Sequence, residues 1–201
     1  MRSIEEHLIS LLDSAQRTSM AEQQNLISNK FQNERRQTVH MFVDNSNISI
    51  GAQLLPTGLR DFSKRLNIAR FTQVVANGRR IARQVVCGSK PPRTSAIWQH
   101  WDRNGYQVMV EWRSPEDNRE QFVDGRLVAE ALMHVNSVGN ANPDNVLVVC
   151  TGDGNTDNQA AGTTGANFQN LVRTVARMGW KVAVMVVMVV MLMWMVLCLV
   201  V

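Results

Sequence analysis

Short apolar runs recur along the chain at 38–44, 82–88, 106–112, 145–151 and 181–184. The first, second and fourth runs are almost continuously apolar, which is typical of strands that are covered on both faces. The run at 106–112 alternates apolar and polar positions, and this alternation favours an edge strand. The pattern therefore predicts a sheet whose central strands include 38–44 and 145–151.

Between these runs, apolar residues recur at helical spacing over 68–78, 95–105, 124–136 and 166–179. Strands that alternate with helices of this length are typical of βαβ units, in which the strands run parallel. We therefore expect an α/β domain with three layers (α/β/α) and a mainly parallel, Rossmannoid sheet.

The two ends of the chain differ from this middle part. Residues 1–36 show intermittent helical spacing on a polar background, which predicts a helical or flexible extension before a domain at 37–184. Residues 182–201 are twenty apolar residues without a break, a length that could span a bilayer as a helix. Only about five or six of them are needed for a fifth strand, and we expect the rest, the tail at 185–201, to have no partner in the sheet.

Three interpretations of this tail remain open. It is a membrane anchor, an overlong buried strand, or an artefact of the gene sequence, because Val, Met, Leu, Trp and Cys are what G/T-rich repetitive DNA encodes. The three cysteines have no spacing typical of a zinc site or a disulfide framework, which favours a reducing compartment. We expect a cytoplasmic or nuclear protein, or a membrane-anchored one if the tail is genuine.

Carboxylates follow two of the predicted strands and open one of the predicted helices. Asp44 ends the first strand, Asp153 follows the fourth, and Asp124 begins the helix at 124–136. Ligands of open parallel sheets bind outside the carboxyl ends of the strands, near the point where the strand order reverses. Each aspartate alone also fits a turn, a helix cap or a loop, so their common placement carries the interpretation.

Three converging carboxylates repel one another unless a cation neutralises them. An all-oxygen ligand set of this kind favours Mg²⁺ or Mn²⁺ over zinc, and the chemistry it suggests is metal-assisted hydrolysis of a phosphate ester. Asn45, Ser46 and Asn47 follow Asp44 directly, and we expect them to orient water or hold the carboxylates.

Three segments together resemble the NYN domain, a branch of the PIN-like ribonucleases. They are "FVDNSN" (42–47), "QFVDGRLVAEAL" (121–132) and "VVCTGDGNTD" (148–157), in the order and spacing of that family. The resemblance implies a metal-dependent endoribonuclease in which Asp44, Asp124 and Asp153 are catalytic metal ligands and Asn45 is a site residue. The family's last aspartate falls on Asn155, and Asp157 lies close enough in sequence to compensate.

The basic residues fit an RNA partner, because phosphate contacts need positive charge and the formal net charge is +4. Those nearest the second strand are Arg79, Arg80, Arg83, Lys90 and Arg93. We therefore expect hydrolysis of phosphodiesters in RNA, most readily single-stranded RNA. Two alternatives stay open: a non-catalytic RNA-binding module on the same fold, and a protein tethered to a membrane through 182–201 whose domain serves interactions.

Overall fold

The computed structural model describes residues 18–26, 28–29, 32–55, 57–89, 96–113, 122–139, 142–151, 168–187 and 196–200. The chain divides into two compact units, Met1–Gln37 and Thr38–Val201. Within the first unit, residues 18–26 and 32–36 are helical. No helix among the described residues combines the length and the apolar character that crossing a membrane requires.

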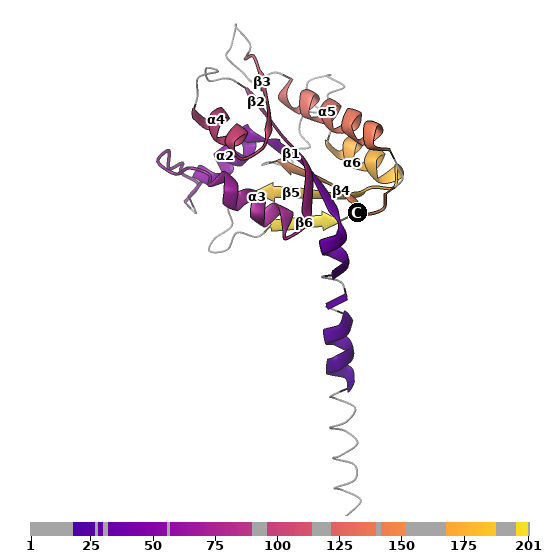
Figure 1. The fold of residues 1–201 in the computed structure, drawn as a ribbon. Helices are drawn as coiled ribbons and strands as arrows, with labels where there is room; N and C mark the ends of the chain where they lie inside the picture. Colours follow the sequence, from indigo (N-terminus) through magenta and orange to yellow (C-terminus); the bar gives the residue numbers. More distant parts are fainter. Residues whose placement is uncertain are drawn as a thin grey trace, which may run out of the picture. The chain divides into compact units, whose positions relative to one another are not determined.

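The second unit is built on one sheet, to which the described residues contribute six strands (Figure 1). These are β1 (Thr38–Asp44), β2 (Arg80–Ser89), β3 (Gln107–Glu111), β4 (Asn145–Thr151), β5 (Lys181–Val187) and β6 (Val196–Val200). Their order is β3-β2-β1-β4-β5-β6, and the first five run parallel. The predicted mainly parallel sheet is confirmed, with β1 and β4 adjacent at its centre and β3 at an edge.

The end of the apolar tail departs from the expectation. Val196–Val200 pairs antiparallel with β5, so the prediction that the tail beyond the fifth strand has no partner in the sheet is wrong for these residues. The physical reason is that β5 would otherwise present an unpaired edge of N–H and C=O groups, and a nearby β-prone segment can pair with it. The apolar run itself gave no signal of where a chain reversal would fall.

The helices cover the sheet on both faces, which gives the three predicted layers (Figure 1). Helices α3 (Ile68–Ala76) and α4 (Ala96–Arg103) supply Phe71 and Trp101 to one core cluster. Helices α5 (Val123–Val138) and α6 (Phe168–Arg177) supply Leu127 and Leu171 to the other. Strand β1 is buried along its whole length, because it lies between β2 and β4 with a layer on each face.

One short helix, α2 (Asn45–Gln53), was not predicted, and it begins directly after β1. It contacts β1, β2, β4 and β5, so it crosses the sheet rather than running along one strand. Gly88 allows this close approach, because a Cβ atom there would lie 2.6 Å from the Trp98 ring and 3.3 Å from Asn45 Cβ. The lack of a side chain at Gly88 therefore lets α2 and α4 cover the end of β2.

Candidate active site at the carboxyl ends of the strands

Asp44 ends β1 and caps α2, so one residue closes a strand and opens a helix. Its side chain is buried, with 3% of the residue exposed. Oδ1 accepts hydrogen bonds from the backbone N–H groups of Ser46 (2.9 Å) and Asn47 (3.2 Å). Aspartate is favoured at this cap position because it satisfies N–H groups that have no partner inside the helix. The strand therefore ends on a carboxylate that is held in a fixed direction.

Asn47 connects this carboxylate to the neighbouring strand. Its Nδ2 group donates to Asp44 Oδ2 at 2.9 Å and lies 3.3 Å from Thr151 Oγ1 at the end of β4. We call Asp44, Asn47 and Thr151 the carboxyl-end cluster. Strands β2 and β3 follow β1 on one side and β4 lies on the other, so the cluster sits where the strand order reverses. Open parallel sheets bind their ligands at such a point.

The other two polar residues after Asp44 have different surroundings. Asn45 is buried, and its Oδ1 accepts from Trp101 Nε1 (2.8 Å) and from Ser49 Oγ (3.0 Å). This arrangement anchors α4 to the start of α2, which is a structural role. Ser46 contributes its backbone N–H to Asp44. Of the three residues predicted to support the carboxylate, Ser46 and Asn47 therefore bond to it in the structure.

The alternation of side chains along the strands places several polar groups on one face. Val43 and Cys150 belong to the core on the α3 side, whereas Phe42 and Val149 belong to the core on the α5 side. Successive strand residues point to opposite faces, so Asp44 and Thr151 lie on the face that α5 covers. Asp124, half-buried in the first turn of α5, begins the helix that packs on this face.

The electrostatics at this edge of the sheet are negative around Cys87, which pairs with Asp44 in the register. Burial raises the pKa of the Cys87 thiol to about 12, and the carboxylates of Glu111 and Asp44 contribute to the rise. Arg126, in the first turn of α5, opposes the shift, and its Nε lies 3.8 Å from Glu111 Oε1. Glu111 and Arg126 therefore form an ion pair, and both of them, with Asp44, act on the Cys87 thiol.

The oxygen donors at this edge are of the chemical type that divalent cations bind. Asp44 and Asp124 are carboxylates and Thr151 is a hydroxyl, which is the hard oxygen set that Mg²⁺ and Mn²⁺ prefer. A cation would also offset the negative field that the Cys87 thiol senses. Among the described residues, no three His, Cys, Asp or Glu side chains come together as a metal site. The third predicted ligand, Asp153, lies outside the described residues, as do Asn155 and Asp157.

The arginines predicted to bind RNA lie elsewhere. Arg80 begins β2 opposite Thr38 and its Nη2 donates to Thr38 Oγ1 (3.0 Å), about 20 Å from Asp44 along β1. Arg79 donates to the carbonyls of Val75 and Ala76, where it caps α3. These two side chains therefore stabilise the amino-end edge of the sheet. Lys90 and Arg93 lie outside the described residues.

Arg83 belongs to a buried polar group that the sequence did not reveal. Its Nη2 lies 2.6 Å from Glu130 Oε1 on α5. Next to this pair, His134 on α5 meets His40 on β1, with Nε2 and Nδ1 2.8 Å apart, and His40 Nε2 lies 3.3 Å from Asn145 Oδ1. We call His40, His134 and Asn145 the histidine cluster. His40 lies about a hundred residues from each of the other two members, so no local motif in the sequence could have indicated the histidine cluster.

The hydrogen bonds assign the protons in the histidine cluster. An amide oxygen only accepts, so His40 Nε2 carries the proton and His40 Nδ1 accepts from His134 Nε2. The His40 ring is therefore neutral. Burial lowers the pKa of His40, and burial followed by the neighbouring His40 lowers the pKa of His134 to about 4. The cluster is thus a structural feature at neutral pH.

Two exposed aromatic residues flank, in sequence, the segment between β3 and α5. Trp112 follows β3 and is 67% exposed, and Phe122 precedes α5 and is 77% exposed. Phe122 has a φ of +64°, a left-handed conformation that costs a non-glycine residue about 1 kcal/mol or more. By contrast, Trp98 and Trp101 are buried in the core.

Comparisons with known proteins support the fold alone. No family model matches the chain, and no curated protein matches it. A crystal structure of a protein of unknown function from Vibrio parahaemolyticus is similar, with a TM-score of 0.51 and 15% sequence identity. The match covers 76% of this chain and 83% of that one. The three-layer α/β architecture is therefore shared with a solved protein.

Proposed function

We propose that the domain at 38–187 is a metal-dependent ribonuclease domain of the NYN, PIN-like type. The observation that carries the proposal is the buried carboxylate of Asp44 at the reversal point of the strand order, joined through Asn47 to Thr151. A core strand that ends on a buried, oriented carboxylate fits a cation site better than a simple turn. The resemblance of the three motifs supplies the substrate class.

In this proposal Asp44, Asp124 and Asp153 hold Mg²⁺ or Mn²⁺. A bound ion would supply activation of a water molecule and neutralisation of charge that develops on the phosphate oxygens. The amides of Ser46 and Asn47 fix Asp44 Oδ1, and Asn47 Nδ2 fixes Oδ2, so the carboxylate does not need to reorient during turnover. Water adds to phosphorus and gives up a proton to solvent, while the P–O bond to the leaving nucleotide breaks and the leaving oxygen takes a proton from solvent.

The test is cleavage of a fluorescent single-stranded RNA by wild type and Asp44→Asn, with Mg²⁺, Mn²⁺ or EDTA. Asparagine is as good a helix cap as aspartate, so α2 keeps its first turn while the site loses a charge. Asp144→Asn is the matched control, because Asp144 lies before β4 at the amino-end edge, where its carboxylate contacts Lys181. Cleavage is expected in wild type and Asp144→Asn only, and only with metal.

Binding of Mn²⁺, followed by calorimetry, gives a second readout. We expect Asp44→Asn to weaken it and Asp144→Asn to leave it unchanged. Cleavage that survives both EDTA and Asp44→Asn would refute the metal mechanism. RNA binding without cleavage by any variant would instead favour the non-catalytic RNA-binding module on this fold.

A further inference from the structure

We propose that the cleft between the start of α3 and one face of α4 binds a small organic anion with an apolar body. We call it the α3–α4 cleft. It encloses about 530 Å³, a volume typical of small-molecule sites in proteins. Asp44, Asn47, Thr151 and Asp124 do not line it, so this site is separate from the candidate active site and does not depend on the nuclease function.

The two helices that form the cleft lie on the same side of the sheet (Figure 1). Residues 65–69 line it from the start of α3. Ala96, His100 and Asn104 line it from α4, and their spacing of four residues places them on one face of that helix. The cleft is therefore formed by elements that the core holds in place.

One part of the lining is apolar. Leu66 and Ile68 contribute from α3, and Ala96 and Ile97 contribute from α4. Ile68 is buried and belongs to the core cluster against which Leu66 and Ile97 pack. An apolar group that entered the cleft would leave water for a surface continuous with this core, which favours binding.

The polar part of the lining offers hydrogen-bond donors and a positive charge. None of the described residues that line the cleft is acidic, and Arg65 is the cation among them. Arg65 Nη1 donates to the carbonyls of Phe62 and Lys64, which leaves Nε and Nη2 without a hydrogen-bond partner among the described residues. Asn67 Oδ1 accepts from the Arg70 N–H at 2.9 Å, so the Asn67 side chain keeps its Nδ2 group as a donor.

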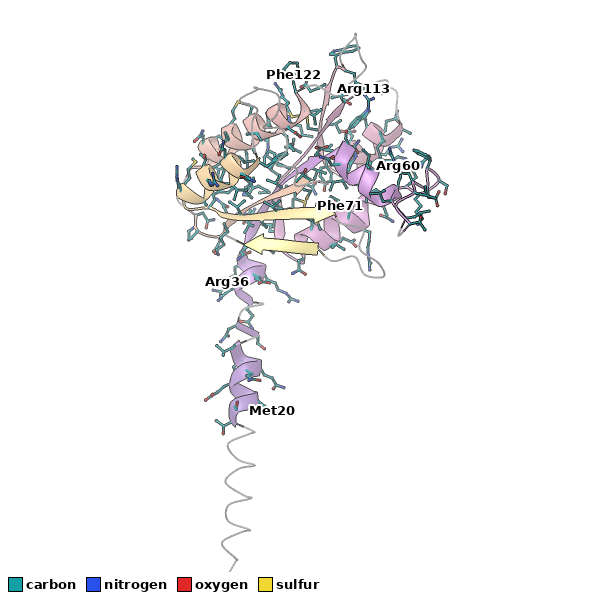
Figure 2. All side chains as sticks on the ribbon, turned by 180° about the vertical axis from the view of Figure 1, so that it is seen from behind. Met20, Arg36, Arg60, Phe71, Arg113 and Phe122 are labelled. Carbon is teal, nitrogen blue, oxygen red and sulfur yellow. The ribbon has the colours of Figure 1, made fainter. Side chains whose placement is uncertain are left out.

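The charges around the cleft do not cancel. The segment that leads into α3 carries four basic residues and one carboxylate. The basic residues are Arg60, Lys64, Arg65 and Arg70, and the carboxylate is Asp61. Figure 2 labels Arg60 in this segment and Phe71 in α3. On α4, Asp102 and Arg103 balance each other, so the surroundings keep an excess of positive charge that favours an anionic ligand.

The backbone of α3 supports the same choice of ligand charge. The N–H groups of Ile68 and Ala69, which line the cleft, have no hydrogen-bond partner among the residues that the structure describes. Such groups at the start of a helix attract anions. The anionic group would lie near Arg65 and these N–H groups, and the apolar body would lie against Leu66 and Ile97.

The experiment measures binding of 1-naphthyl phosphate to the full chain by calorimetry in EDTA, where no metal can link the phosphate to the carboxyl-end cluster. The comparison ligands are 1-naphthol, which has the same ring without the charge, and inorganic phosphate. Arg65→Gln removes the cation, and Ala69→Phe fills the cleft. Both positions are exposed, so neither substitution disturbs the core. Arg70→Gln is the matched control, because Arg70 is an exposed cation of the same turn that does not line the cleft.

We expect Arg65→Gln and Ala69→Phe each to weaken binding of 1-naphthyl phosphate about tenfold, and Arg70→Gln to change it about twofold at most. Both comparison ligands should bind wild type about tenfold more weakly than 1-naphthyl phosphate. No binding by wild type, or unchanged binding by Ala69→Phe, would overturn the site. Equal losses in Arg65→Gln and Arg70→Gln would show attraction to the basic surface alone and would also overturn it.

Asp44→Asn separates this site from the candidate active site. It should bind 1-naphthyl phosphate as wild type does, even if it has lost metal-dependent cleavage. Loss of binding in Asp44→Asn would place the ligand at the carboxyl-end cluster and would reject the α3–α4 cleft. Absence of RNA cleavage in every variant would reject the nuclease and leave the cleft intact.

Discussion

The histidine cluster and the carboxyl-end cluster lie on the same face of one strand, yet they are built in opposite ways. His40 and Asp44 are four residues apart on β1, about 13 Å, and both face the α5 side of the sheet. The histidine cluster is neutral, its members hydrogen-bond to one another, and the His40 ring packs against the Trp180 ring. The carboxyl-end cluster holds a buried charge that is bonded to the first N–H groups of a helix.

The difference follows from the position of each cluster along β1. In the middle of β1, a polar side chain is enclosed by neighbours and must be satisfied by other side chains of the core. At the end of β1 the chain turns into α2, and helix amides can orient a carboxylate without closing the site. Polar residues on one face of one strand thus complete the core at one point and present an oriented carboxylate at the other.

We expect the largest effect from a pair of variants, one in each cluster. The carboxyl-end variant should lose activity, and the histidine-cluster variant should lose stability. Asp44→Asn should abolish metal-dependent cleavage and lower the free energy of unfolding by only about 1 kcal/mol, through the lost Asn47 bond. His134→Ala should leave cleavage at the wild-type rate while lowering the free energy of unfolding. Cleavage assays and urea unfolding of both variants measure this, and a matching loss of activity in His134→Ala would contradict the separation.

The next prediction concerns the ion pair beside the histidine cluster. Glu130→Ala removes the carboxylate that pairs with Arg83, so the half-buried Arg83 guanidinium keeps no counter-charge. It then lies beside the neutral rings of His40 and His134, which cannot compensate its charge. We expect a loss of about 2 kcal/mol, less than for a fully buried pair because Arg83 is partly solvated. Glu111→Ala breaks a more exposed pair and should cost about 0.5 kcal/mol. Urea unfolding that ranks the two variants in reverse would refute this interpretation.

The pH dependence of stability should come from the histidine cluster. The folded-state pKa of His134 is about 4, below the ordinary value of 6.5, so the unfolded chain binds more protons between these values. Stability is then complete above pH 6.5 and falls as the pH drops toward 4. Because His134 is only partly buried, we expect a loss of about 1–2 kcal/mol. Thermal unfolding from pH 7 to 4 measures it, and His134→Gln should flatten the curve.

The smallest effect concerns the charge of the carboxyl-end site. Asn155→Asp restores the aspartate that the resembled family has, and we expect about fivefold tighter binding of Mg²⁺, or ~1 kcal/mol. The readout is the Mg²⁺ concentration that gives half-maximal cleavage. Unchanged Mg²⁺ dependence would place residue 155 away from the metal.

The sequence alone predicted the strands well where apolar runs were bounded by polar residues. β1 and β4 were predicted to the residue, and β3 was recognised as an edge strand by its alternation. Helix α2 was missed because "NSNISIGAQ" has no apolar stripe, and the only signal was Asp44 as its cap. Strand β6 was missed because an unbroken apolar run does not indicate where the chain reverses.

The candidate site could be predicted in part for a related reason. Element ends are local features, so Asp44 and Asp124 could be placed at the carboxyl edge from the sequence, as the structure has them. Partners are not local: Arg83 was predicted to bind RNA, but Glu130, 47 residues away, binds it in the structure. The histidine cluster stayed hidden for the same reason, because His40 and His134 are 94 residues apart.

The central place of β1 has a consequence for synthesis on the ribosome. Its first residue pairs with Arg80 in β2 and with Asn145 in β4, so its two neighbours lie 42 and 107 residues further along the chain. At about 5–20 residues per second, β4 leaves the ribosome roughly 5–20 s after β1. Until then the carboxyl-end cluster lacks Thr151, which bonds to the Asn47 side chain. If the domain cleaves RNA, a nascent chain would therefore be inactive until β4 has been made and has paired with β1.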